Sequence, residues 1–145
     1  VLLIHVQISS IQIPKVVPGF RLMTPASKYP LGALNWIVQN GLHGNILPFF
    51  EWGEFIIWHL SPSCRVAMDG RYETVYEDHV HREYFEFLFA RPAWRLFLQK
   101  YPHEMILLHT GIEIVERMKR EKDWKIAYND KISVVFIKNS IVHQE

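Results

Sequence analysis

The sequence has one cysteine, seven glycines and no long run of apolar residues. A single cysteine excludes an internal disulfide and any zinc site built from several cysteines. The glycines Gly41, Gly44 and Gly53 do not make a dinucleotide-binding or phosphate-loop fingerprint. Because no apolar stretch approaches about 20 residues, we expect no helix that spans a bilayer. The net charge of +1 favours neither nucleic acid nor an acidic substrate as a partner.

Acidic residues are missing from the first fifty positions, and all fifteen lie from Glu51 onward. Four prolines, at positions 14, 18, 25 and 30, interrupt the first thirty residues of this acid-free stretch. We therefore expect residues 1–29 to form an extended connector, either an arm on the domain surface or a linker from a preceding domain. Val1–Ile13 is rich in β-branched residues, which also allows a strand there. The chain begins with Val1, so we expect it to be a piece of a longer protein.

The whole chain of 145 residues is 49% hydrophobic, which is enough to bury one core. We predict one α/β domain over residues 30–138, followed by a C-terminal tail over 139–145. Apolar periodicity and turn residues predict five helices, over residues 30–40, 51–60, 79–90, 92–101 and 110–122. They also predict five strands, over residues 45–48, 65–68, 105–109, 125–128 and 132–137.

Three of these predictions rest on specific local patterns. In the helix over 51–60, apolar residues on both sides, Ile57 and Trp58 included, predict burial on most faces. The segment from Thr110 to Glu113 has the spacing of a capping box, which predicts the start of a helix. Asn129-Asp130 between two apolar runs predicts a hairpin turn.

The order of the elements predicts the fold class. Strands that alternate with helices are typical of a mainly parallel sheet with helices on both faces. We predict a three-layer α/β sandwich with strand order 2-1-3 and a C-terminal antiparallel hairpin. It would be Rossmann-like but without a dinucleotide fingerprint.

Ligands in open α/β sheets usually bind outside the carboxyl ends of the strands. Three predicted loops begin at the carboxyl ends of the first three strands. They supply six candidate substrate-binding residues: Glu51, Trp52, Glu54, Asp69, Arg71 and His109. Each has a structural alternative. Glu51 suits the first turn of a helix, where the dipole favours a carboxylate, and Asp69 can pair with Arg71 across Gly70.

Other chemistry has weaker support in the sequence. The His, Glu and Asp residues form no His-Glu-x-x-His motif, and no serine lies in a Gly-x-Ser-x-Gly motif. No motif marks Cys64 as a nucleophile. We therefore predict no metal, no cofactor and no catalytic residue in this chain.

Three segments resemble one protein family. They are the stretch from Tyr29 to Asn45, the segment Phe50-Glu-Trp-Gly-Glu-Phe-Ile-Ile-Trp58 and the segment Val66-Ala-Met-Asp-Gly-Arg71; Pro92-Ala-Trp94 and the ending from Trp124 to Phe136 add to them. In order and spacing they resemble the soluble C-terminal domain of bacterial multi-spanning membrane proteins. These proteins are glycosyltransferase- or mannosyltransferase-like and of the GT-C type. The similarity covers about residues 30–138.

A more distant resemblance links two of these motifs to the Trp-Trp-Asp-Tyr-Gly region of oligosaccharyltransferase catalytic subunits, which recognises the acceptor peptide. Here Glu51 replaces the Asp, and Phe49-Phe50 replaces the Trp pair. Glu54 replaces the second Gly of the closer family. In such enzymes the catalytic carboxylates and the metal lie in loops between membrane helices, outside these 145 residues.

The resemblance implies an extracytoplasmic, periplasmic domain of an integral membrane protein. It would cover the membrane active site and assist binding of a glycan or polypeptide acceptor, and it would not itself be catalytic. Its partner would be the transmembrane part of its own parent chain. Two alternatives stay open. One is a self-contained α/β enzyme that uses His109 or Asp69 as acid or base, and the other is a purely structural or interaction module.

Overall fold

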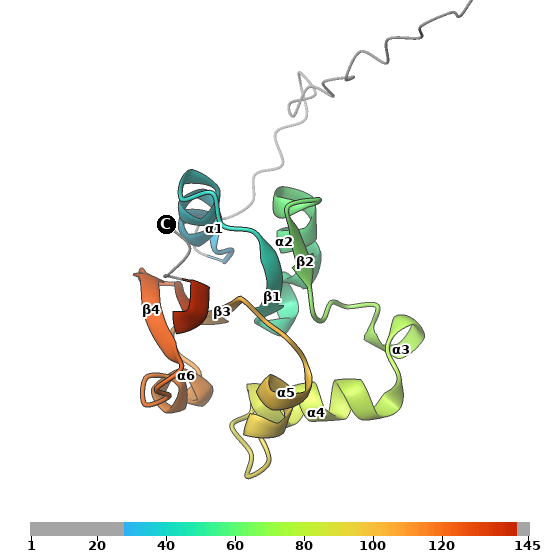
Figure 1. The fold of residues 1–145 in the computed structure, drawn as a ribbon. Coiled ribbons are helices and arrows are strands. Elements are labelled where there is room, and N and C mark those ends of the chain that lie inside the picture. Colours follow the sequence, from blue (N-terminus) through green and yellow to red (C-terminus); the bar gives the residue numbers. More distant parts are fainter. Residues whose placement is uncertain (1–27, 142–145) are drawn as a thin grey trace, which may run out of the picture.

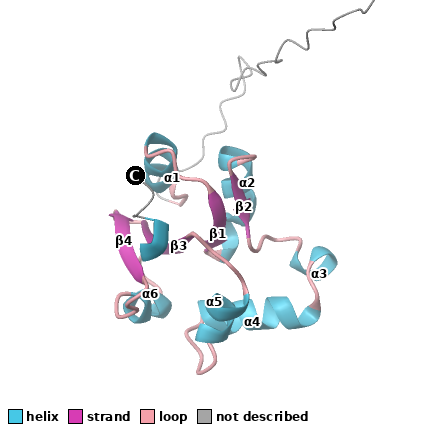
Figure 2. Cartoon of the chain, viewed as in Figure 1, coloured by secondary structure: helices cyan, strands magenta, loops and turns pink. Residues whose placement is uncertain are grey.

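The computed structural model describes residues 28–141, which form a mixed α/β fold around a five-stranded sheet (Figures 1 and 2). Most of the predicted connector, including the possible strand over Val1–Ile13, lies outside the described residues, as do residues 142–145 of the predicted tail. The described start of the tail is a short 3-10 helix, η2 (Asn139–Ile141). Among the described helices, none has both the length and the apolar character needed to cross a membrane.

The predicted helices and strands form in the predicted order, with shifts at their ends, and one short helix that the periodicity did not predict, α3 (Tyr72–Val75), lies among them. In chain order they are α1 (Leu31–Gln39), β1 (Gly44–Pro48), η1 (Phe50–Trp52), α2 (Gly53–Leu60), β2 (Cys64–Val66), α3 (Tyr72–Val75), α4 (Asp78–Leu88), α5 (Arg95–Lys100), β3 (Met105–His109), α6 (Glu113–Met118), β4 (Trp124–Asn129) and β5 (Ser133–Lys138).

The sheet has the order β2-β1-β3-β5-β4. The pairs β1–β2 and β1–β3 are parallel, and the pairs β3–β5 and β4–β5 are antiparallel. The sheet is therefore parallel only in part, over β2, β1 and β3, since the C-terminal hairpin adds two antiparallel pairs. The strand order also differs from the prediction, because it continues beyond 2-1-3 with β5 rather than β4 next to β3. The hairpin contributes two of the five strands, and its strand β5 forms five residue pairs with the central strand β3.

Alternate residues of the central strands face two separate apolar clusters. Leu47, Ile106 and Phe136 pack with one cluster, and their neighbours Ile46, Leu107 and Val135 pack with the other. Side chains of α1 and α2 complete the second cluster, and side chains of α4, α5 and α6 complete the first. Figure 1 shows the same division, with α1 and α2 at the top and the other three helices at the bottom.

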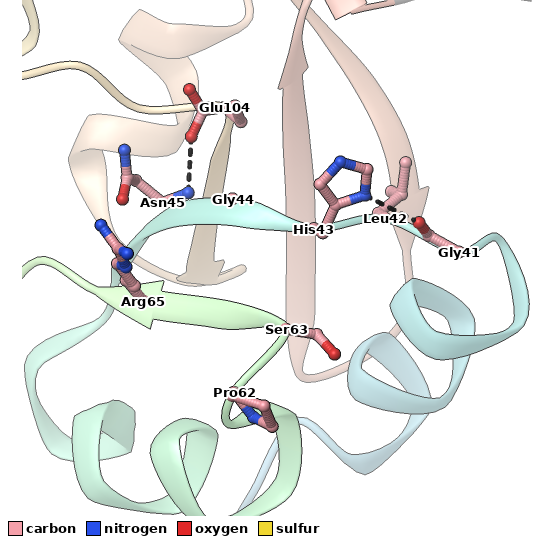
Figure 3. A pocket seen from close by; sticks show the side chains of 9 residues that line it. All are labelled: Gly41, Leu42, His43, Gly44, Asn45, Pro62, Ser63, Arg65 and Glu104. Atoms are coloured by element: carbon pink, nitrogen blue, oxygen red, sulfur yellow. Dashed lines mark hydrogen bonds between the residues drawn. The ribbon is translucent and has the colours of Figure 1, made fainter.

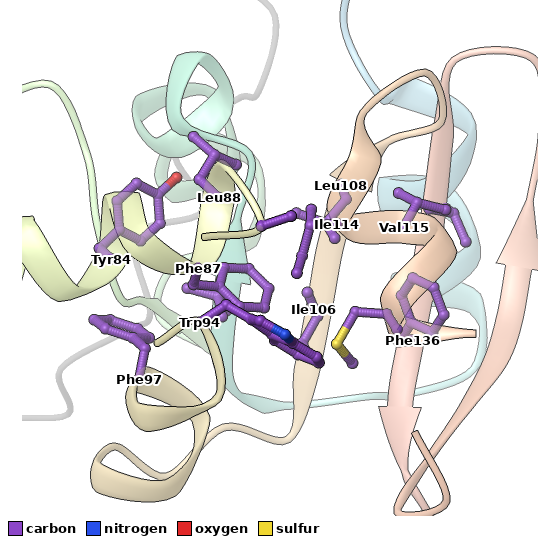
Figure 4. Packing of buried hydrophobic residues seen from close by; sticks show 14 of the residues in the cluster. Tyr84, Phe87, Leu88, Trp94, Phe97, Ile106, Leu108, Ile114, Val115 and Phe136 are labelled. Carbon is purple, nitrogen blue, oxygen red and sulfur yellow. The ribbon is translucent and has the colours of Figure 1, made fainter. Parts of the chain in front are cut away.

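The first cluster is dominated by aromatic rings. Trp94 and Phe97 come from the α5 region and Tyr84 and Phe87 from α4, and they lie against the strand residues Ile106 and Phe136 (Figure 4). The buried Tyr84 hydroxyl donates to the carbonyl of Pro48 at 2.8 Å. This bond ties α4 to the carboxyl end of β1, where the predicted ligand site lies.

Two local predictions are wrong. Thr110 does not cap a helix, since its hydroxyl donates to the carbonyl of Lys131 at 3.1 Å and α6 begins only at Glu113. Trp58 is 81% exposed, so α2 is not buried on most faces.

The hairpin forms as predicted, but its turn is one position later than Asn129-Asp130. The Asp130 carboxylate accepts the backbone N–H groups of Ile132 and Ser133, at 2.8 and 2.7 Å, which fixes the turn after β4.

Candidate functional site

Three loops leave the carboxyl ends of β1, β2 and β3 at one edge of the sheet, as the strand directions require. We call the residues Phe49–Glu54, Asp69–Tyr72 and His109–Gly111 the carboxyl edge. All six candidate residues lie on it, and the contacts among them fall into two groups.

The first group joins the loop after β1 to the loop after β2. The Glu54 carboxylate accepts the backbone N–H of Gly70 at 2.6 Å. Beside it, Gly53 lies so close to the second loop that a Cβ there would be 2.5 Å from the Met68 carbonyl oxygen and 2.7 Å from the Asp69 Cα. Only glycine fits this approach, since real side chains do not come so near to backbone atoms.

The second loop is held by an ion pair. Arg71 Nε and Nη2 donate to the two carboxylate oxygens of Asp69, at 2.9 and 2.7 Å, and the backbone N–H of Arg71 donates as well, at 2.9 Å. Asp69 is fully buried, whereas the Arg71 side chain is 61% exposed. The Tyr76 hydroxyl is a fourth donor, at 3.3 Å. The structural alternative for this pair is thus realised, with Arg71 still open to solvent on one side.

The pKa of Asp69 tests the alternative of a self-contained enzyme in which Asp69 acts as acid or base. The hydrogen bonds from the Arg71 guanidinium lower the pKa of Asp69, against the opposing effect of burial. Burial raises the pKa of Tyr76, and the neighbouring Asp69 carboxylate adds to this. A carboxylate whose lone pairs are occupied and whose pKa is lowered is a poor acid or base near neutral pH. Asp69 therefore acts as an anchor for the loop.

The second group consists of Trp52 and His109, whose ring centroids are 5.8 Å apart. Trp52 is only 2% exposed, and its indole N–H donates to the Lys28 carbonyl at 3.0 Å. The ring and the indole N–H of Trp52 are thus already used within the domain. His109 Nδ1 accepts the backbone N–H of Gly111 at 3.1 Å.

Glu51 is one of the candidates that are open to solvent. It lies in η1, is exposed and has no hydrogen bond or ion pair with another described residue. Sequence reasoning missed the contributions of Gly53 and Tyr76. A single glycine between an aromatic and a charged residue, as at position 53, could have indicated a close backbone approach. Nothing in the sequence marked Tyr76.

The opposite edge of the sheet holds a hollow that the sequence did not predict. Its volume is about 520 Å³, and it lies where β1, β2 and β3 begin (Figure 3). We call it the amino-edge hollow; it is lined by Gly41, Leu42, His43, Gly44, Asn45, Pro62, Ser63, Arg65 and Glu104. A second hollow of about 440 Å³ lies between α5 and α6 and is lined mostly by ion-paired Arg and Glu side chains.

Within residues 28–141, no group of three or more His, Cys, Asp or Glu side chains is arranged to hold a metal ion. Comparisons of the chain with protein-family models, with curated proteins and with solved structures found no match.

Proposed function

We propose that this chain is an extracytoplasmic domain of a membrane protein of the lipid-linked-sugar glycosyltransferase type, and that it assists acceptor binding without performing bond making. The resemblance of residues 30–138 to the soluble domains of such proteins is the starting point. Under this proposal the carboxyl edge faces the membrane active site, and the partner is the transmembrane part of the same parent chain.

One observation carries the proposal. Two motifs that carry the resemblance, Phe50-Glu-Trp-Gly-Glu54 and Asp69-Gly-Arg71, have 14 residues between them in the chain. They contact each other through the Glu54–Gly70 hydrogen bond and the close approach of Gly53. This contact accounts for a glycine at position 53 and a carboxylate at position 54. A rigid edge is what acceptor positioning needs, because a preorganised site loses little entropy on binding.

The division of roles follows from exposure. Glu51 and Arg71 are the residues that face a ligand: the carboxylate accepts hydrogen bonds from sugar or peptide donors, and the outer side of the guanidinium binds a carboxylate or phosphate. Asp69 holds Arg71 in place, Glu54 holds the backbone of Gly70, and Trp52 and His109 pack on each other.

A finer fold assignment is part of the same proposal. The two apolar clusters on opposite faces of the sheet, each completed by helices, support a three-layer, Rossmann-like sandwich.

The test is glycosyl transfer by the parent membrane protein with substitutions in this domain. We expect Glu51→Gln and Arg71→Lys each to lower acceptor transfer by about tenfold, the effect of losing one charged hydrogen bond of about 1.5 kcal/mol. Asp123→Asn is the matched control, since it neutralises an exposed carboxylate next to the start of β4, at the opposite edge. Unchanged transfer in both test variants would contradict the proposal.

A further inference from the structure

The amino-edge hollow is a second place where side chains from separate strands come together. Asn45 on β1 pairs in register with Arg65 on β2, and Glu104 directly precedes β3 on the other side of β1. Figure 3 shows the side chains of these three residues grouped at one end of the hollow, with His43 at the other. Its volume of about 520 Å³ is within the range of small-molecule sites, about 300 to 1,000 Å³.

The carboxylate in this group is held in a fixed position. The backbone of Glu104 donates to the Asn45 carbonyl at 3.1 Å and accepts from Lys138 N–H at 3.1 Å, while its carboxylate Oε2 accepts the Asn45 backbone N–H. Gly44 makes room for the Glu104 carboxylate, because a Cβ at this position would be 2.7 Å from Oε2. Its backbone φ of +118° favours glycine as well. The other oxygen, Oε1, has no partner among the described residues.

Much of the hydrogen-bonding capacity in the hollow is unused. Neither the Arg65 guanidinium nor the side chains of Asn45 and Ser63 form a hydrogen bond or ion pair with another residue of the described chain. The guanidinium alone has five N–H donors, and the amide both donates and accepts. Leu42 and Pro62 add apolar surface elsewhere in the lining of the hollow.

Charge and geometry together select the ligand chemistry. Arg65 and Glu104 carry opposite charges, so a ligand with a large charge of either sign gains little here. The guanidinium, carboxylate and amide are planar groups, each able to bridge two adjacent polar atoms. A neutral molecule with neighbouring hydroxyl groups, which both donate and accept, matches all three.

We propose that the amino-edge hollow binds a saccharide through Asn45, Arg65 and Glu104. The site is separate from the carboxyl edge, and the proposal does not depend on the membrane-protein assignment.

The experiment is an NMR titration of the 145-residue chain, labelled with ¹⁵N, with glucose, mannose, N-acetylglucosamine and their disaccharides. We expect at least one saccharide to bind with a Kd on the order of 1 mM, as suits a small ligand in an open site. The amide signals that move should be those of residues 41–45, 63–65 and 104. Arg65→Ala should raise the Kd by about tenfold or more, since it removes charged hydrogen bonds.

Two controls make the result decisive. Arg117→Ala removes an exposed arginine of α6, remote from the hollow, and should leave the Kd unchanged. The amide spectrum of each variant reports whether it is folded. The proposal is overturned if no saccharide shifts these signals up to about 50 mM, or if Arg65→Ala leaves the Kd unchanged. It is also overturned if a zwitterionic amino acid such as glycine binds there and saccharides do not.

Discussion

Arg71→Met removes the guanidinium from a buried carboxylate and tests how the carboxyl edge is held. In the variant Asp69 keeps only the backbone N–H of residue 71 and the long hydrogen bond from Tyr76. Breaking a buried ion pair costs about 3 to 5 kcal/mol. Because the Arg71 side chain is 61% exposed and water can replace part of it, we expect a loss of about 2 to 4 kcal/mol in the free energy of unfolding.

The assay is urea denaturation at pH 7, with Arg117→Met as the matched control. The Arg117–Glu113 pair has the same 2.7 Å separation as the Arg71–Asp69 pair, but its carboxylate is exposed whereas Asp69 is fully buried. Its removal should cost less than about 1 kcal/mol.

The pH dependence gives a second check. Asp69 has a lowered pKa in the folded protein, so its stabilising contribution is complete above the unfolded value of 3.8 and is lost as the pH falls through the folded value. The gap between wild type and Arg71→Met should therefore narrow below about pH 4. Equal losses in the Arg71 and Arg117 variants, or a gap that does not change with pH, would refute the reasoning.

Three further predictions concern packing and protonation. Gly53→Ala should lower the free energy of unfolding by about 2 kcal/mol in the same urea assay, because the new Cβ meets backbone atoms. The control is Gly111→Ala, whose Cβ would be 3.5 Å from its nearest neighbour; it should change the free energy of unfolding by less than about 0.5 kcal/mol. His103 is 4% exposed, and burial lowers its pKa from 6.5 to about 4, so folding favours the neutral ring. Stability should fall by about 2 kcal/mol between pH 7 and pH 5, and His103→Leu should abolish that loss; an equal loss in the variant would contradict this assignment. Trp58→Ser should leave the unfolding midpoint unchanged and remove the emission of a solvent-exposed tryptophan, since the ring is 81% exposed; a large drop in the midpoint would show that the ring is packed.

Much of the fold could be predicted from local patterns. The apolar run of β3 and the periodicity of α1 gave their bounds to within one residue, because burial on one or both faces fixes the pattern of side chains directly. The short α3 (Tyr72–Val75) was missed, since four residues carry no helical period. The prediction for Thr110 failed because a residue 21 positions away, Lys131, takes its hydroxyl.

The candidate site shows the same limit. The strand-end rule located the three loops correctly, and the Asp69–Arg71 pair was foreseen as an alternative because its partners are two residues apart. The use of Glu54 by the Gly70 N–H depends on a contact between loops, which no local pattern indicates. The amino-edge hollow was missed for that reason too, since Asn45 and Glu104 are 59 positions apart and neither is unusual by itself.

The central claim, that this domain belongs to a membrane protein of the glycosyltransferase type, is tested most directly by reading the coding sequence on both sides of residues 1–145. The account predicts several apolar spans of about 20 residues upstream, with acidic residues in the loops between them. A start codon close to Val1, with no such spans on either side, would contradict it.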